Sequence, residues 1–202
     1  KGANLTLDGG TFAGNGDLSV AGTLNLKGEL IKHVAHPGTQ SGAGTTEVTS
    51  TGLVKINGSS WGQTLLTDGR SVDNSGKIAF SSDGFLEMDS GTSLTDEKGS
   101  TLGLDGNGGI YPTTPTPSDP APSILQKGSI TESGSGKSVI GVATTFSGGT
   151  VKVSKGSLLI NSNTLPKAPV SRNSGYGVAT CDVSNNHICH DLETDKAVPQ
   201  GA

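Results

Sequence analysis

Short runs of alternating hydrophobic and polar residues recur along the chain, and they come in pairs separated by a glycine. Period-two alternation places the hydrophobic side chains of a run on one face, so each run predicts a half-buried β-strand of three or four residues. No helical periodicity is sustained anywhere, and the sequence therefore predicts an all-β fold. The paired runs are Leu18–Val20 with Leu24–Leu26, Thr46–Val48 with Val54–Ile56, Ile78–Phe80 with Leu86–Met88, Leu94 with Leu102–Leu104, and Val151–Val153 with Leu158–Ile160.

Two all-β architectures could use such units. In an antiparallel sandwich, neighbouring runs pair as hairpins, and their strands are typically longer and carry aromatic core residues. In a β-solenoid, each run is one side of a coil and pairs with the equivalent run of the next coil, about 4.8 Å away. The short runs, the scarcity of aromatic residues and near-repeats every 20 to 30 residues or so favour the solenoid.

The composition agrees with an ordered chain that has few large hydrophobic side chains to bury. Only 31% of the 202 residues are hydrophobic and 3% are aromatic, while 32 residues are glycine. Disorder is the alternative, but disordered chains usually combine low hydrophobicity with a large net charge. Here the net charge is −4 and the hydrophobic residues are regularly spaced, which favours a folded structure.

Charge and hydropathy exclude two classes of partner. The 14 basic residues are scattered and the chain is mildly acidic, which disfavours nucleic acid. No hydrophobic run approaches the 18 residues or so that a membrane span needs. No signal peptide precedes the first strand-like run, and we expect the sequence to be a piece of a longer protein.

Three segments resemble degenerate repeats of very large secreted or cell-surface bacterial proteins. They are residues 5–26 (LTLDGGTFAGNGDLSVAGTLNL), 123–142 (SILQKGSITESGSGKSVIGV) and 146–160 (FSGGTVKVSKGSLLI). The resemblance covers most of residues 1–165 and implies a right-handed parallel β-helix, as in adhesins and autotransporter-like stalks. It also implies an extracellular or cell-surface location, but it assigns no functional residue.

Two regions depart from the repeat. Residues 111–123 contain five of the nine prolines and cannot form an interior strand. A linker between domains is one interpretation, but repeat-like sequence resumes after Ser123, so we expect a surface loop inserted into one coil of a solenoid over residues 1–165. Residues 166–202 lose the periodicity, and we expect an irregular C-terminal segment there.

The C-terminal segment holds both cysteines, Cys181 and Cys189. An even number of cysteines in a chain that resembles secreted proteins predicts a disulfide between them. Free thiols remain an alternative. Haem attachment is a further one, because His190 follows the second cysteine, although the spacing between the cysteines is five residues too long for that motif.

Candidate metal ligands are few. The pairs His33/His36 and His187/His190 could offer imidazoles to zinc, but nothing in the sequence brings the two pairs together. The glycine-rich turns 14–17 and 105–109 are similar to calcium-binding turns of nonapeptide β-rolls, which need tandem copies. We therefore expect ordinary corner turns, no metal and no cofactor.

Many β-helices are polysaccharide-active enzymes, which gather carboxylates, arginines and aromatic residues on one face. Acids of this chain lie near each other in two groups, Asp83/Glu87/Asp89 and Asp96/Glu97. We expect both groups to point outward and the narrow interior to hold aliphatic side chains only. Without buried titratable groups, no catalytic centre is predicted.

The sequence thus predicts a non-catalytic structural or adhesive module whose partner is a glycan or another component of a host or cell surface. The runner-up is a carbohydrate-binding or polysaccharide-active β-helix, with a candidate ligand surface around Trp61, Tyr111 or the proline-rich loop. Ice binding is a third class, but the threonines form no regular rank.

Overall fold

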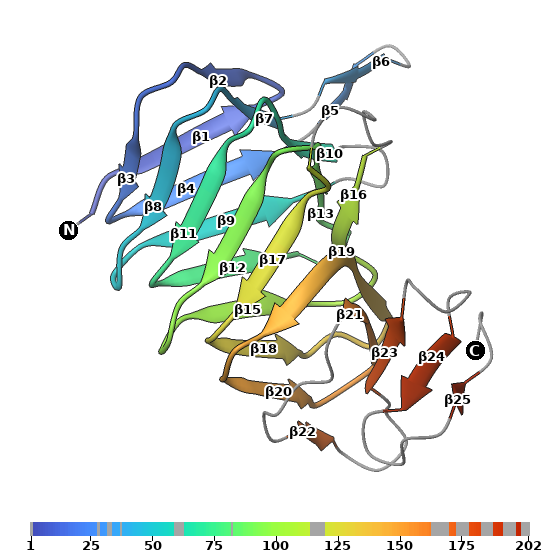
Figure 1. Ribbon diagram of the computed structural model, residues 1–202. Coiled ribbons are helices and arrows are strands. Elements are labelled where there is room, and N and C mark those ends of the chain that lie inside the picture. The colour runs from blue at the N-terminus through green and yellow to red at the C-terminus, as the bar shows by residue number, and fades with distance from the viewer. Residues whose placement is uncertain are drawn as a thin grey trace.

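A computed structural model describes residues 2–27, 29–31, 34–36, 38–58, 63–81, 83–113, 120–162, 170–172, 178–182, 188–191 and 197–198. These residues form strands and turns without any helix. Figure 1 shows the strands stacked side by side from the N-terminus to the C-terminal part of the chain. The fold is a parallel β-solenoid, as the repeats predict.

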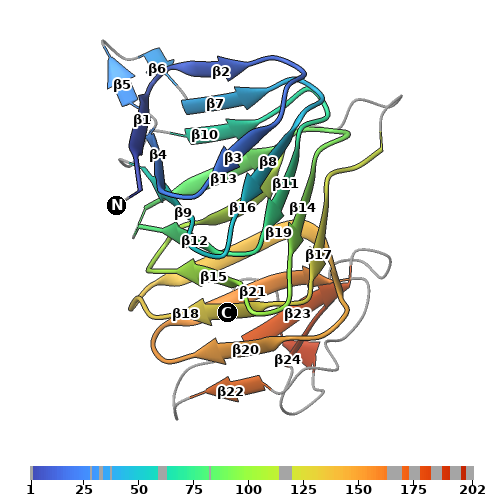
Figure 2. The same ribbon diagram turned by 90° about the vertical axis from the view of Figure 1, so that its left-hand side faces the viewer.

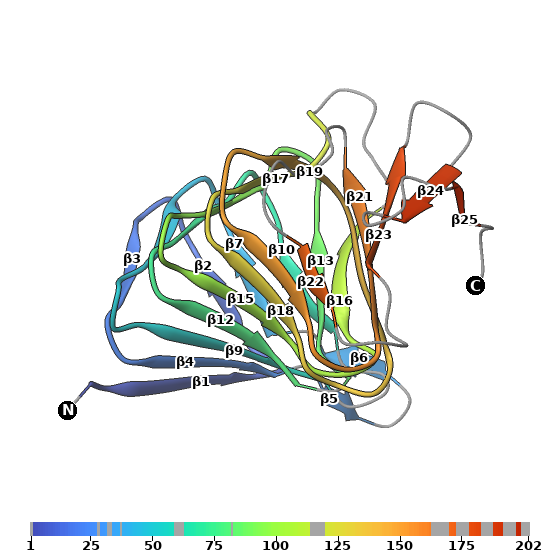
Figure 3. The same cartoon turned by 90° about the horizontal axis from the view of Figure 1, so that it is seen from below.

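Each coil of the solenoid has three sides. Equivalent strands of successive coils pair in parallel and build three faces. Face 1 consists of β1 (Asn4–Asp8), β4 (Thr23–Lys27), β9 (Leu53–Asn57), β12 (Lys77–Phe80), β15 (Thr101–Leu104), β18 (Ser129–Glu132), β20 (Thr150–Val153) and β22 (Val170–Arg172). Face 2 consists of β2 (Thr11–Ala13), β7 (Gly38–Ser41), β10 (Gln63–Leu66), β13 (Phe85–Met88), β16 (Gly109–Pro112), the first part of β19 (Lys137–Phe146), β21 (Ser157–Ser162) and β23 (Val178–Asp182). Face 3 consists of β3 (Leu18–Val20), β8 (Thr45–Val48), β11 (Ser71–Asn74), β14 (Ser93–Asp96), β17 (Ser123–Gln126) and the last part of β19. Figures 2 and 3 show these faces from two further directions.

The strand register aligns like side chains from coil to coil. On face 1, Leu24 pairs with Val54, Val54 with Ile78 and Ile78 with Leu102, and the series continues through Ile130 to Val151. These side chains point inward, and burying such stacks is the main favourable contribution to folding. An antiparallel sandwich is excluded, because every pairing among the strands of the three faces is parallel.

The hydrophobic core predicted from the alternation is confirmed. All of the following predicted residues are buried: Leu24, Leu26, Val48, Val54, Ile56, Ile78, Phe80, Leu86, Met88, Leu102, Leu104, Val151, Val153, Leu158 and Ile160. The core also includes residues outside the predicted runs, such as Ile110 on face 2 and Val72 and Ile124 on face 3. The interior is well filled, since the void that Leu66 and its neighbours surround measures only about 20 Å³.

The proline-rich segment interrupts a single coil. β16 ends at Pro112 and β17 begins at Ser123, and these strands are consecutive sides of one coil on faces 2 and 3. Residues 114–119 lie outside the described part of the chain. A second excursion, the antiparallel pair β5 (Glu29–Ile31) and β6 (Val34–His36), lies between faces 1 and 2 of an earlier coil.

Parallel stacking continues beyond residue 165, where the repeat pattern fades. β22 pairs with β20 and β23 pairs with β21, both in parallel. The direction then changes, because β24 (Ile188–Asp191) and β25 (Ala197–Val198) add antiparallel strands to β23. In the described part of the C-terminal segment, β22 therefore extends face 1, and β23, β24 and β25 extend face 2.

Candidate functional site

Tyr111 lies on the outer surface of face 2, next to a second aromatic side chain. The ring centroids of Tyr111 and Phe85 are 5.7 Å apart and the rings are tilted by 48°. Both side chains are partly buried, and the pKa of the Tyr111 hydroxyl is raised by that burial. Tyr111 also lies against Gly141, at which an added Cβ would be 3.7 Å from the Tyr111 ring. Trp61, the other predicted ligand residue, lies outside the described residues.

Glu87 lies between Tyr111 and Leu65 on the outer surface of face 2. It pairs with Leu65 on one side and with Tyr111 on the other, so the three residues form an outward-facing row. Burial raises the pKa of the Glu87 carboxyl. Asp89 lies in the following turn, where its Oδ1 accepts hydrogen bonds from the Ser90 amide and the Thr113 hydroxyl, each at 2.8 Å. Face 2 thus combines an outward-facing aromatic pair with the Glu87 carboxylate.

A groove of about 470 Å³ lies at the corner between faces 3 and 1. Three stacked corner connections form it, namely residues 97–100, 127–128 and 147–149. The middle connection is the shortest, so it is set back between longer neighbours and becomes the floor of the groove. The lining residues are Lys98, Gly99, Lys127, Gly128, Ser129, Ser147, Gly148, Gly149 and Thr150.

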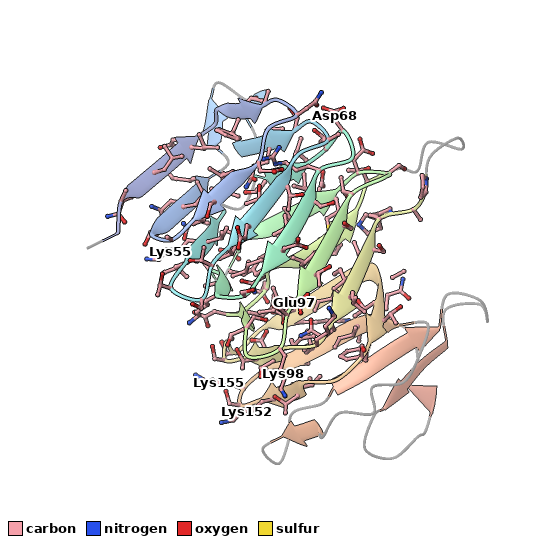
Figure 4. All side chains as sticks on the ribbon, turned by 60° about the vertical axis from the view of Figure 1, so that its left-hand side comes forward. Lys55, Asp68, Glu97, Lys98, Lys152 and Lys155 are labelled. Atoms are coloured by element: carbon pink, nitrogen blue, oxygen red, sulfur yellow. The ribbon has the colours of Figure 1, made fainter. Side chains whose placement is uncertain are left out.

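The groove carries two basic side chains, Lys98 and Lys127. Lys127 Nζ is 2.8 Å from Glu97 Oε1, in an ion pair that is partly exposed. Lys98 is exposed at the rim, and the hydroxyl of Thr150 is hydrogen-bonded to that of Ser129 at 3.1 Å. Figure 4 shows Lys98, Lys152 and Lys155 gathered over the C-terminal coils, whereas Lys55 lies closer to the N-terminal end.

A buried polar network lies directly beneath this groove. Asn74, Asp96 and Gln126 occupy the same inward position in three successive coils, and all three are fully buried. Asp96 Oδ1 accepts hydrogen bonds from Asn74 Nδ2 at 2.6 Å and from Ser100 Oγ at 2.7 Å, and Asp96 Oδ2 accepts one from Gln126 Nε2 at 2.5 Å. Burial raises the pKa of Asp96, and these hydrogen bonds oppose the shift.

The prediction that Asp96 points outward is therefore wrong, and so is the prediction of a purely aliphatic interior. Glu132 is a second buried carboxyl, placed in register between Leu104 and Val153. Its Oε1 accepts the amide hydrogens of Gly134 at 2.7 Å and Gly106 at 3.3 Å, which offsets part of the cost of burying the carboxyl. Burial raises the pKa of Glu132.

Arg70, one of the two arginines, is also fully buried and connects three coils. Its Nε donates to Thr46 Oγ1 at 3.0 Å, while its terminal nitrogens donate to the carbonyl oxygens of Gly14 at 3.2 Å and Gly16 at 3.3 Å. The guanidinium carbon also lies 5.6 Å from the centroid of the Phe12 ring. Arg70 thus has a structural role at the corner between faces 2 and 3.

The glycine-rich turns that are similar to calcium sites use their oxygens within the fold. Asn15 Oδ1 and Asp17 Oδ1 accept the amide hydrogens of Ala43 at 3.1 Å and Thr45 at 2.9 Å in the next coil. Asn107 Oδ1 likewise accepts the Lys137 amide hydrogen at 3.2 Å. These turns therefore join successive coils. Within the described ranges, His, Cys, Asp and Glu form no group of three that could hold a metal ion.

The two cysteines are opposite each other in the backbone pairing of β23 with β24. Cys181 and Cys189 are direct partners in this antiparallel ladder. Directly opposed residues have Cα atoms about 4.5–5.5 Å apart, within the range that a disulfide spans. The bond itself stays a prediction. Of the histidine pairs, His33 and His187 lie outside the described residues, so the zinc hypothesis stays untested.

Comparison with known proteins adds no functional assignment. No protein-family model matches the chain, and neither a curated protein nor a solved structure matches it. Within the part of the chain that the structure describes, no helix has the length and hydrophobicity needed to cross a membrane.

Proposed function

We propose that the chain is a non-catalytic structural and adhesive module of a secreted bacterial surface protein. Its role in this proposal is to form a stiff rod and to present flat faces to ligands. The observation that carries the proposal is the unbroken inward register of face 1, from Leu24 to Val151, which joins successive coils into one core. Such stacking makes neighbouring coils mutually dependent and the rod resistant to bending.

The buried carboxyls support a structural rather than a catalytic role. Asp96 is fully buried, and both of its oxygens already accept hydrogen bonds from the coils above and below. A general acid or base must reach the substrate proton within hydrogen-bonding distance. The interior void of about 20 Å³ admits roughly one water molecule and no sugar. Ligands are therefore expected on the outer faces and corners.

The extracellular assignment rests on the sequence. The repeat-like segments resemble those of secreted and cell-surface bacterial proteins, and the opposed cysteines would form a disulfide only in an oxidising compartment.

Adhesion and catalysis can be measured on the same preparation. The chain is applied to an array of immobilised neutral and acidic glycans. In a second assay it is incubated in solution with the corresponding polysaccharides. We expect retention on at least one glycan class and no new reducing or unsaturated ends. Turnover that is lost in the variant Glu87→Ala, while the variant Asp73→Ala retains it, would overturn the non-catalytic assignment.

A second candidate is a carbohydrate-binding face built on the aromatic pair of face 2. Phe85 and Tyr111 offer ring surfaces on which the C–H groups of a sugar can stack, and Glu87 offers an acceptor for its hydroxyls. The test is the double variant Phe85→Ala/Tyr111→Ala. If this face binds glycans, the variant loses retention of neutral glycans while its thermal unfolding stays cooperative.

A further inference from the structure

We infer that the corner groove and the adjoining lysines of face 1 bind an extended acidic polysaccharide. The inference rests on the proposed adhesive function and names its ligand class. The groove supplies Lys98 and Lys127, and Lys152 and Lys155 follow on the strand and turn that lead away from it. We call these four residues the lysine track.

The shape of the track follows from the coil geometry. Thr150 lines the groove, and Lys152 is two residues further along β20, so both side chains are on the outer surface of face 1. Lys155 stands in the turn that ends this side of the coil and is exposed. The track therefore crosses face 1 along the strand direction, as an extended linear chain would lie.

The charge along this path is predominantly positive, although the whole chain has a net charge of −4. From β9 to β20, the outward positions of face 1 hold no carboxylate: Leu53, Lys55, Asn57, Lys77, Ala79, Thr101, Gly103, Ser129, Thr131, Thr150 and Lys152. The exposed carboxylate beside the groove is Glu97, which is paired with Lys127. An acidic ligand therefore encounters three further lysines along the track.

The residues that line the groove favour an acidic polysaccharide over nucleic acids and anionic lipid surfaces. Ser129, Ser147 and Thr150 supply hydroxyls that can exchange hydrogen bonds with sugar hydroxyls. No aromatic side chain lines the groove, so nucleic-acid bases would find no stacking partner. No large hydrophobic side chain lines it either, so it offers nothing to insert into a lipid surface. Lysines bind the negative charge of carboxylate and of sulfate groups. The experiment distinguishes carboxylated from sulfated polysaccharides.

Binding is measured with polygalacturonate as the carboxylate probe and dextran sulfate as the sulfate probe, with neutral dextran and duplex DNA as comparisons. The chain is immobilised, and each probe is applied at low and at high salt. We expect binding of at least one acidic polysaccharide that weakens with salt, and weaker binding of dextran and DNA. Preference for one probe over the other identifies the recognised group.

Lysine variants locate the binding. Lys98→Gln, Lys127→Gln, Lys152→Gln and Lys155→Gln should each lower the affinity about two- to fivefold, as expected for exposed charge contacts. The quadruple variant should lower it at least about tenfold. Lys55→Gln on the same face is the matched control and should change it less than twofold. Glu97→Gln, which frees Lys127, should raise the affinity about two- to fivefold.

Several results would overturn the inference. One is binding of neutral dextran as tight as that of the acidic polysaccharides, and another is binding of DNA that is tighter than theirs. A third is a loss of affinity in Lys55→Gln as large as that in Lys152→Gln. A fourth is undiminished binding of the acidic polysaccharides by the quadruple variant, with an unchanged unfolding midpoint. Retention on neutral glycans alone would reject the lysine track and leave the adhesive function standing. Cleavage of a polysaccharide would reject the non-catalytic function, whatever the lysine variants do.

Discussion

Gln126 Nε2 lies 2.5 Å from Asp96 Oδ2, although 30 residues of chain separate the two amino acids. Both occupy the same inward position in successive coils, where the neighbouring stacks carry leucine, isoleucine or valine. The other amide atom of this side chain, Gln126 Oε1, is buried without a hydrogen-bond partner. The pair therefore fixes the register of two coils while leaving one buried acceptor unsatisfied, a cost of about 1–3 kcal/mol.

This arrangement predicts that Asp96→Asn stabilises the fold at neutral pH. Rotation of the Gln126 amide by half a turn would let Gln126 Oε1 accept a hydrogen bond from the introduced side-chain amide, so the contact between the two side chains is kept while a buried charge is removed. We expect the free energy of unfolding at pH 7 to rise by about 1–2 kcal/mol. Urea denaturation measures it. The control is Asp73→Asn, an exposed change on the adjacent strand, which should stay within about 0.5 kcal/mol.

The same carboxyls predict how stability changes with pH. Burial raises the pKa of Asp96 and of Glu132 in the folded state, so the folded protein binds protons that the unfolded chain has already released. Stability is therefore higher below the ordinary carboxyl pKa of about 4, and it falls as the pH rises through the raised folded values. The double variant Asp96→Asn/Glu132→Gln should flatten this fall as the pH rises from about 4 towards neutrality. An equal slope in the double variant and the wild type would contradict the prediction.

Much of the fold could be predicted from the sequence, because the strands of face 1 alternate cleanly. Leu24, Leu26, Val54 and Ile56 show the period-two pattern, and all are buried as expected. The spacing between equivalent residues, from 19 (Leu5 to Leu24) to 30 (Leu24 to Val54), indicates coils of variable length. Five strands of face 1 were thus recognisable from hydrophobicity alone, each with one neighbouring run on face 2 or face 3.

The buried polar positions and the groove could not be predicted in this way. On face 3 the inward positions include Asn74, Asp96 and Gln126, so the polar residues that alternation assigns to solvent are in the core. Their burial depends on partners one coil away, and sequence spacing does not give the coil register. The groove depends on the different lengths of stacked corner connections, which is likewise a relation between coils. The outward position of Glu87 was predicted, because Leu86 and Met88 flank it with a regular pattern.

Arg70 connects the N-terminal coils, and its replacement should loosen them selectively. Arg70→Met removes the donors to Thr46, Gly14 and Gly16, and the shorter side chain leaves space in the interior. We expect a loss of about 2–4 kcal/mol in the free energy of unfolding. Hydrogen exchange should accelerate most in residues 4–20. Lys55→Met, an exposed change, serves as control, and an equal cost for both variants would contradict the role of Arg70.

The disulfide between Cys181 and Cys189 is predicted from their direct opposition in the β23–β24 pairing. Thiol titration of the oxidised protein under denaturing, non-reducing conditions should find no free thiol. The loop of nine residues implies a contribution of roughly 2–3 kcal/mol from loop-closure entropy. The double variant Cys181→Ser/Cys189→Ser should therefore unfold more easily. Two titratable thiols in freshly secreted protein would show that the bond does not form.

Glycine is required where the backbones of successive coils meet, and Gly134 is such a position. A Cβ added at Gly134 would overlap the backbone of Gly106 in the preceding coil. Gly134→Ala also threatens the 2.7 Å hydrogen bond from its amide to Glu132 Oε1. The expected cost is about 2 kcal/mol or more, because displaced backbone strains both coils.

Gly16→Ala is the matched control for this last prediction. Gly16 also stands at a corner, but no atom lies within 4 Å of its added Cβ, and its φ is outside the left-handed region. Alanine should therefore be neutral there or stabilise the fold by up to about 1 kcal/mol, through the lower entropy of the unfolded chain. Urea midpoints of the two variants measure the difference. If both variants cost the same, close contact between coils does not explain why glycine occupies the corner at Gly134.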